Sequence, residues 1–513
     1  MELFNLLERA LPEIGQTFNV SLNWIGELIR LLINGIGIVG VGIILFSLIL
    51  KLIVLPCDIY QRVAMRKQNI KMEEQKERME KLQKQYANDQ EMYNQKVMEM
   101  YKENGISMFS SCLPMILSMI IFIGAINGFN GYSQYSAIQN YNDMVGAYKA
   151  KIESYCPDLE AVTLDFTTEG KITVKSADKP LFYRVPVGEY TSASDEATVK
   201  EYVKNSQNKA YYIDLDQAEM IPEIGSAVTP EKSLSDVAYE YFVGEAQLAV
   251  KTCYETEIVE RTKFLWIENI WATDAAHVHP VLSFTEFETK AKTEKFDVNG
   301  EQVDYASLAE KTGTKAYTQG IYDEITGKLD AQKTTPNGYY VLILLSIGTI
   351  LLQQFVSMRS QKAQNKYSTV DGQGASQQKM MMFMMTAMFA FFSFMYSGAF
   401  SIYLVVSNVF SLASTLIINK VVDGIMEKKS LQETITKYDN RMLSRIEAAK
   451  NSGRESAKES REKKMEKDQV APKKAEKTVE KKEETTSPQT AENELKKDVE
   501  KDETTEGDEV QGE

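Results

Sequence analysis

Cysteine and histidine are both rare in this chain, whose 513 residues include four Cys and two His. A disulfide-dense scaffold needs a much higher cysteine content, so that class is excluded. The two histidines, His277 and His279, have no evident third ligand nearby in the sequence, and we expect no metal site. With 12 Pro and 28 Gly, the composition also excludes a collagen-like chain.

Two patterns of energy-driven transporters are missing as well. No G-x-x-x-x-G-K-[ST] phosphate loop occurs in the sequence, which argues against a nucleotide-driven pump. The long apolar runs contain no Asp, Glu or His, which argues against a carrier built on a proton relay. The first 17 residues lack the basic start of a signal peptide, and no Cys nearby suggests a lipoprotein anchor.

Charge is distributed unevenly along the chain, which carries 58 Lys+Arg and 72 Asp+Glu. Residues 57–111 hold 10 basic and 9 acidic side chains, and residues 358–379 hold 4 and 1. Residues 131–338 hold 20 basic and 34 acidic side chains. Because apolar runs with almost no charge separate these segments, a single soluble domain is excluded.

These apolar runs predict five membrane spans, since about 20 apolar residues cross the hydrocarbon core as a helix. The last run, 380–418, is too long for one span and is divided by the turn-forming residues 396–399. A buried core helix is the alternative for any single run. The expected spans are 36–56, 112–130, 339–357, 380–396 and 398–419.

Basic residues in the short loops set the expected orientation. Segments 57–111 and 358–379 together carry 14 Lys and Arg, which places both in the cytoplasm. The N-terminus and segment 131–338 then lie outside, and the C-terminal tail lies inside. Residues 1–35 are expected to form amphipathic helices on the outer face, because the apolar residues of 22–36 share one helical stripe.

The polar segments carry separate expectations. Residues 57–111 predict a charged helical hairpin with its turn at 87–89, serving either to bind clients or partners or as a plain spacer. Segment 131–338 predicts a mixed α/β domain with strands at 172–175 and 182–185 and a turn at 297–301. The tail predicts a helix over 420–450 and disorder over 451–513.

Individual side chains in the outer segments are also candidates for specific roles. Trp24, Trp266 and Trp271 are predicted to anchor the protein at the membrane interface. Cys156 and Cys253 both fall on the outer side, where they could form a disulfide or remain thiols.

Lys51 is the one cation within a predicted span. An ammonium in hydrocarbon costs roughly 2.5–3.5 kcal/mol. Lys51 could snorkel to the cytoplasmic interface near Pro56, although helical side chains lean toward the N-terminus, here the outer side. A water-filled cavity is the other interpretation, and both stay open. Ser47 lies one turn earlier on the same face.

Uncharged polar residues in the other spans either line the same cavity or form helix–helix hydrogen bonds. They are Ser118, Gln353, Gln354, Tyr403, Ser407 and Asn408.

Four stretches of the sequence carry a resemblance to a known family. They are 46–56, with its basic residue, apolar run and Pro; 104–105 with 112–115; 264–267; and 377–382 with 402–408. Together they resemble the YidC–Oxa–Alb family of membrane protein insertases, in its bacterial form. Most bacterial members carry Arg where this chain has Lys51. Lys lacks the planar guanidinium fork, so the two cations are not equivalent.

The predicted fold is mainly α. It comprises a five-span helical membrane bundle with a cytoplasmic helical hairpin, a mixed α/β extracytoplasmic insertion and a disordered C-terminal tail. The resemblance implies that the helices surround a hydrophilic groove, open to cytoplasm and lipid and closed on the outside. A client's polar tail would enter this groove while its apolar segment moves into lipid.

The same resemblance implies an insertase and chaperone that makes or breaks no bond, and therefore no enzyme and no cofactor. Its expected partners are nascent membrane proteins and the lipid bilayer, with the secretion channel and the ribosome as further candidates. It would be a multi-pass protein of the bacterial plasma membrane. Two other classes stay open: a small-anion channel or carrier, and a surface-binding protein anchored by its spans.

Overall fold

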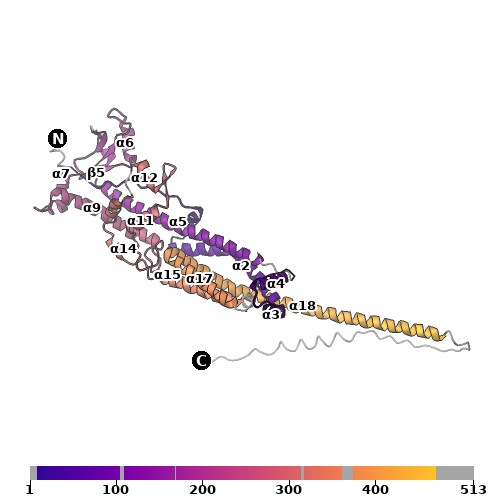
Figure 1. The fold of residues 1–513 in the computed structure, drawn as a ribbon. Coiled ribbons are helices and arrows are strands. Elements are labelled where there is room, and N and C mark those ends of the chain that lie inside the picture. The colour runs from indigo at the N-terminus through magenta and orange to yellow at the C-terminus, as the bar shows by residue number, and fades with distance from the viewer. Residues whose placement is uncertain (1–7, 104–108, 168, 314–316, 361–373, 469–513) are drawn as a thin grey trace, which may run out of the picture. The chain divides into compact units, whose positions relative to one another are not determined.

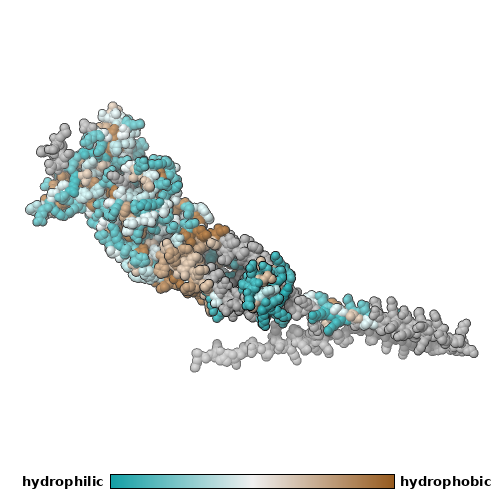
Figure 2. All heavy atoms as spheres, viewed as in Figure 1, coloured by the Kyte–Doolittle hydropathy of each residue, from teal (hydrophilic) through white to brown (hydrophobic). Residues whose placement is uncertain are grey.

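The computed structural model describes residues 8–103, 109–167, 169–313, 317–360 and 374–468. The chain divides into two units, Met1–Met426 and Glu427–Glu513. Helices dominate the first unit, which also holds a five-stranded and a two-stranded sheet (Figure 1). Figure 2 shows hydrophobic residues gathered on the surface of its helix bundle, whereas the surface of the sheet-bearing domain is mostly hydrophilic.

Three helical segments within the described residues are long and apolar enough to cross a membrane: Val39–Ala64, Val341–Arg359 and Gly398–Val421. A shorter apolar helix covers Met382–Met395. The side chains at the apolar start of α5, residues 109–118, lie outside the described part of the chain. The structure therefore supports three of the predicted spans. The helices of the bundle are α1 (Trp24–Ile36), α2 (Val39–Glu74), α5 (Phe109–Ser154), α15 (Val341–Ser360), α17 (Gly374–Met395) and α18 (Gly398–Asp468).

Several helices run past the ends predicted from the sequence. Helix α2 passes through Pro56, and α5 continues without a break from the predicted second span into the sheet-bearing domain. Helix α18 continues to Asp468, so the disorder predicted for 451–468 is wrong. Those residues are rich in Lys, Glu, Arg and Ala, which are strong helix formers. The rest of the predicted disordered tail, 469–513, lies outside the described residues.

A helical hairpin follows α2, as the sequence predicts. It consists of α3 (Lys76–Gln85) and α4 (Gln90–Glu103), with the predicted turn between them. Arg78, at the start of α3, forms an ion pair of 2.9 Å with Glu103, at the end of α4, so the two helices are antiparallel. Their buried seam contains Met79, Tyr93, Val97, Met100 and Tyr101.

The five-stranded sheet is antiparallel throughout, in the order β1-β5-β4-β3-β2. Its strands β3 and β4 confirm the two predicted from alternating hydrophobicity. The predicted turn at 297–301 joins β6 to β7, with Asn299 and Gly300 at the positive φ values that such hairpins require. The strands are β1 (Glu8–Ala10), β2 (Asp165–Phe166), β3 (Lys171–Val174), β4 (Leu181–Pro186), β5 (Ala210–Asp214), β6 (Lys295–Val298) and β7 (Glu301–Asp304).

Strand β1 contradicts the expectation of helices across residues 1–35. It pairs with β5 at the sheet edge, and Glu8 forms an ion pair of 2.8 Å with Arg184 of β4. Strand pairing with a distant segment, invisible to local periodicity, decides the conformation here. Only α1 confirms the predicted amphipathic helix.

Short helices complete the domain around α5 and α9 (Leu234–Cys253), which pack against each other. Its core is a single large cluster of buried apolar residues. The remaining helices are η2 (Leu159–Ala161), α6 (Glu196–Asn205), α7 (Leu215–Glu219), α8 (Pro222–Gly225), η3 (Tyr254–Ile258), α10 (Val259–Thr262), α11 (Phe284–Ala291), α12 (Tyr305–Thr312), α13 (Gln319–Ile325) and α14 (Asp330–Thr334).

The disulfide left open by the sequence is not formed, since Cys156 and Cys253 are both free thiols. The Cys156 sulfur faces the carbonyl of Ile152, and the Cys253 sulfur faces that of Asp143. Burial raises the pKa of the Cys156 thiol to about 12, so this thiol is protonated and unreactive at neutral pH.

Candidate functional site

One end of the helix bundle is closed by apolar packing. Helices α1, α2, α5, α15 and α18 and the loop 263–283 all contribute to one buried cluster. At its centre the rings of Phe46 and Phe129 meet edge to face, with centroids 5.5 Å apart. Phe400 and Tyr403 of α18 also pack on Phe129, with ring centroids 6.4 and 5.6 Å from it. We call this whole buried cluster the apolar closure.

Polar side chains begin directly beyond the apolar closure. Lys51 lies five residues after Phe46, about 7.5 Å further along α2, and its ammonium donates a hydrogen bond of 3.1 Å to Ser411 of α18. Ser47 is buried, and its hydroxyl donates to the carbonyl of Ile43. We define the polar cluster as Ser47, Lys51, Ser407, Asn408, Ser411, Ser414 and Thr415.

Helix α18 supplies most of the polar cluster. Ser407, Ser411, Ser414 and Thr415 recur at helical spacing, and all four are buried. The buried side-chain amide nitrogen of Asn408 has no hydrogen-bond partner among the described residues. Buried polar groups cost free energy unless they are hydrogen-bonded, so the Asn408 nitrogen favours contact with water or a polar ligand at this point of the row.

Two further charges follow Lys51 along α2. Asp58 interacts electrostatically with Lys51 and also with Arg62. Spacings of seven and four residues keep these groups on one side of the helix. Sequence reasoning missed this row of three charged residues because it ended the first span at Pro56 and treated Asp58 as part of the hairpin. The spacing of seven residues from Lys51 was the available signal.

The other polar candidates are more dispersed. Gln354 accepts a hydrogen bond of 3.1 Å from Thr386, so it joins α15 to α17. Gln353 is half-buried on α15, and the side chain of Ser118 lies outside the described residues. Tyr403 is buried in the apolar closure. Of the residues predicted from the sequence, Ser47 therefore lies on α2 with Lys51. Ser407 and Asn408 lie on α18 with Ser411, the hydrogen-bond partner of Lys51.

The loop 263–283 ties several helices together at the apolar closure. Phe264 and Ile267, from the sequence motif, exchange two backbone hydrogen bonds of 3.0 Å in a tight turn. The carbonyls of Ala272 and Ile270 accept hydrogen bonds from the amides of Gly398 and Ala399, at the start of α18. The loop thus fixes the turn between α17 and α18.

Asp274 lies at the centre of this loop and is completely buried. Its carboxylate accepts hydrogen bonds from the amides of Tyr339 and Leu342, at 2.8 and 2.6 Å, and so caps α15. Asn337 bonds the loop backbone at Asn269 through both its oxygen and its nitrogen. Sequence reasoning missed Asp274 and Asn337. A capping-type residue in an otherwise apolar segment was the only signal.

The three tryptophans occupy different environments. Trp24 on α1 is 77% exposed, and Trp266 is half-buried. Trp271 is only 3% exposed and packs against Tyr132, with ring centroids 4.3 Å apart. The prediction of an interface anchor at Trp271 is therefore wrong. Its ring fills space between the loop and α5, where a long-range contact decides its position.

Replacing Gly40 with Ala should disturb the loop, because the Phe264 ring covers this glycine. An added Cβ would lie 2.2 Å from the ring. Overpacking of this kind typically costs about 1–3 kcal/mol, so we expect a lower melting temperature in detergent. Gly348→Ala is the matched control in another span, since nothing lies within 4 Å of its Cβ. Equal melting temperatures for both variants would contradict the close packing of Phe264 on α2.

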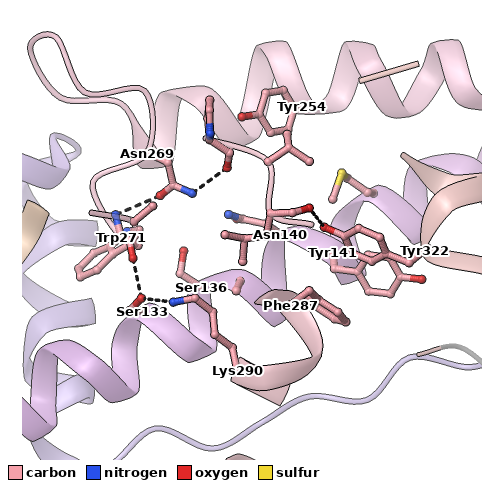
Figure 3. Close-up of a pocket in the computed structure, with 16 residues that line it drawn as sticks. Ser133, Ser136, Asn140, Tyr141, Tyr254, Asn269, Trp271, Phe287, Lys290 and Tyr322 are labelled. Atoms are coloured by element: carbon pink, nitrogen blue, oxygen red, sulfur yellow. Dashed lines mark hydrogen bonds between the residues drawn. The ribbon is translucent and has the colours of Figure 1, made fainter. Parts of the chain in front are cut away.

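A small cavity of about 30 Å³ lies behind the loop, between α5 and α11 (Figure 3). The Lys290 ammonium points into it and donates a hydrogen bond of 2.7 Å to Ser133, whose hydroxyl donates to the carbonyl of Trp271. Burial lowers the pKa of Lys290 to about 8, and the negative charge of Glu286 opposes this effect. The sequence did not reveal this half-buried cation.

Raising the pH from 8 to 10.5 should stabilise the folded protein through Lys290. Because its folded pKa is below the unfolded value, the unfolded state binds more protons in this range, and stability rises with pH. The contribution is roughly 3 kcal/mol for a shift of about 2.5 pH units. Unfolding measured across this range for wild type and Lys290→Met isolates the effect. Parallel pH profiles for the two proteins would contradict it.

A family model described as 60Kd inner membrane protein matches residues 31–162 and 248–427. These ranges contain the end of α1, the polar cluster, most of the apolar closure and the loop 263–283. They leave out all strands of the five-stranded sheet.

Three bacterial relatives are each named "Membrane protein insertase YidC". The protein of Caldanaerobacter subterraneus subsp. tengcongensis is 35% identical over 98 residues, covering 19% of this chain and 46% of the relative. That of Clostridium tetani is 37% identical over 99 residues, covering 19% and 43%. That of Clostridium perfringens is 33% identical over 112 residues, covering 21% and 45%. The chain thus spans a little less than half the length of these relatives. No solved structure gives a significant match.

Proposed function

The chain belongs to the 60Kd inner membrane protein family, and we propose that it inserts nascent integral membrane proteins into the bacterial plasma membrane and helps them fold. The observation that carries this proposal is the polar cluster around Lys51, directly beyond the apolar closure. The names of the YidC relatives support it. The process makes and breaks no covalent bond, so the protein acts as a chaperone without catalytic residues.

The proposed arrangement has five spans, with α5 and α17 completing the three supported above. The loop 263–283 and the segment 131–338 face the outside, and the α3–α4 hairpin and the tail face the cytoplasm. The apolar closure then seals the outer half of the bundle. The polar cluster lines a hydrophilic groove open to the cytoplasm and to lipid.

In this arrangement a client's polar tail enters the groove while its apolar segment moves sideways into lipid. A polar group of the client costs several kcal/mol while it has no hydrogen-bond partner in the membrane. Hydrated polar groups in the cytoplasmic half of the bundle shorten the path over which the client's polar groups lack such partners. The ammonium of Lys51 attracts carboxylates of the tail. The driving force is transfer of the apolar segment, at about −0.3 to −0.6 kcal/mol for each Leu, Ile, Phe or Val.

Reconstitution into liposomes tests the proposal. The purified protein should promote insertion of a short single-span client whose tail becomes protected from added protease, and protein-free liposomes are the control. Flux of small anions without client insertion would instead identify a channel or carrier. Neither insertion nor flux would leave the spans as an anchor for segment 131–338.

A further inference from the structure

A second cavity, of about 260 Å³, lies between α1, α5 and the residues that follow α9. The guanidinium groups of Arg30 and Arg261 both line it, together with Tyr132, Tyr135 and Gln139. It shares Ser136, Asn140 and Trp271 with the smaller cavity of Lys290. A water needs about 10–15 Å³ of such space, so this cavity has room for a group much larger than water.

Neighbouring side chains hold both guanidinium groups in place. Arg30 pairs with Glu27 at 2.7 Å, and Tyr135 lines the cavity beside it. Arg261 donates from the same nitrogen to Asn140 at 2.9 Å and Asp143 at 2.6 Å. Neither carboxylate lines the cavity. A guanidinium carries five N–H donors, so each arginine keeps donors for a ligand beyond these bonds.

The charges around the two cavities favour an anion with one negative charge. Arg30, Arg261 and Lys290 are three cations, and two carboxylates contact them directly, those of Glu27 and Asp143. No carboxylate forms an ion pair with Lys290 among the described residues, and Glu286 acts on it at longer range. Planar guanidinium groups bind phosphate oxygens in pairs, which suits a phosphodiester.

Helix α1 places this cavity beside an apolar surface. Trp24 and Leu31 are 77% and 68% exposed on one side of the helix, and Arg30 lies about 100° or more around the helix axis from both. Glu27, which forms an ion pair with Arg30, lies between the two sides. An amphipathic helix with exposed Trp and Leu lies with its apolar side in the headgroup region of a membrane. The cavity on its polar side then lies at the level of the lipid phosphates.

We propose that the cavity of Arg30 and Arg261 binds the phosphodiester of a phospholipid headgroup in the outer leaflet. The proposal rests on the outer placement of α1 in the proposed function. Free phosphate could form the same hydrogen bonds with the two arginines. The apolar side of α1 next to the cavity favours a lipid, because it can contact the acyl chains. The lipid would join α1 to α5 and α10 through the cationic and polar groups that line the cavity.

Lipid binding to the full-length protein in detergent tests this inference by native mass spectrometry. The probes are phosphatidylglycerol and a diacylglycerol with the same acyl chains but no phosphate. Wild type should retain one more phosphatidylglycerol than the double variant Arg30→Gln/Arg261→Gln, whose affinity at this site should fall at least tenfold. Diacylglycerol should show no such difference.

The matched control is Arg9→Gln/Lys263→Gln, which also removes two cations paired with carboxylates, Asp236 and Glu268, outside the cavity. It should bind lipid as wild type does. Should the double variant not fold, Arg30→Lys is the alternative. It keeps the positive charge without the planar guanidinium group and should weaken retention of phosphatidylglycerol several-fold.

Equal retention by wild type and the folded cavity variants would overturn the inference. Loss of the wild-type advantage on adding sodium phosphate would overturn the lipid as the ligand, in favour of a free anion. No client is present in this experiment, so its failure is distinct from failure of the insertion assay.

Discussion

Lys51→Ala should slow insertion of a client with an acidic tail about tenfold, and insertion of a client with an uncharged tail less than twofold. Two opposite charges 4 Å apart interact by about 4 kcal/mol where the effective dielectric constant is near 20. Tenfold corresponds to only 1.4 kcal/mol, so the expectation allows for extensive hydration of the groove. The measurement compares the initial insertion rates of two clients that differ only in tail charge, in the same liposomes.

Two further variants separate charge from packing at this position. Lys51→Arg keeps the cation and should retain most of the preference for the acidic tail. Ser411→Ala removes the hydrogen bond to Lys51 without removing the charge, and should have a smaller effect. If Lys51→Ala slows both clients equally, the charge has no role in client recognition. A Lys51→Cys thiol that water-soluble reagents cannot reach would contradict a hydrated groove.

The apolar spans and Lys51 could be predicted from the sequence because both are local properties. A charge within an apolar run is visible without knowing what packs around it. The strands of 171–174 and 181–186 were equally accessible, since alternating side chains reveal a half-buried strand. The turn of the hairpin at 87–89 was visible too, because turn-forming residues interrupt a helical pattern there.

Contacts between distant segments could not be predicted in this way. Ser411 lies 360 residues from Lys51, and no local pattern links the two. Burial of Trp271 depends on Tyr132 of another helix. Strand β1 exists because β5, some 200 residues away, offers an edge for pairing. In the sequence Asp274 resembles any polar loop residue. Its role depends on the start of α15, whose amides it binds.

Asp274→Ala should lower the free energy of unfolding by about 3–5 kcal/mol. The carboxylate accepts two hydrogen bonds at the start of α15, and bonds to a charged group contribute about 1.5–3 kcal/mol each. Alanine would also leave the buried amide of Leu342 without its acceptor. Since the same loop holds the turn before α18, we further expect liposomes containing the variant to leak small ions. Thermal unfolding in detergent and an ion-leak assay measure the two effects.

Asp195→Ala is the matched control for Asp274→Ala, because Asp195 also caps a helix, by accepting a hydrogen bond from Thr198 at the exposed start of α6. An exposed cap typically contributes about 1 kcal/mol, and α6 lies outside the bundle, so this control should be only slightly destabilised and should not leak. Asp274→Asn retains one carbonyl acceptor and should fall between the two. A loss of stability at Asp274 no larger than at Asp195 would mean that loop 263–283 does not hold the apolar closure. Leakage without loss of stability would instead mean that the loop seals the bundle end without supporting the fold.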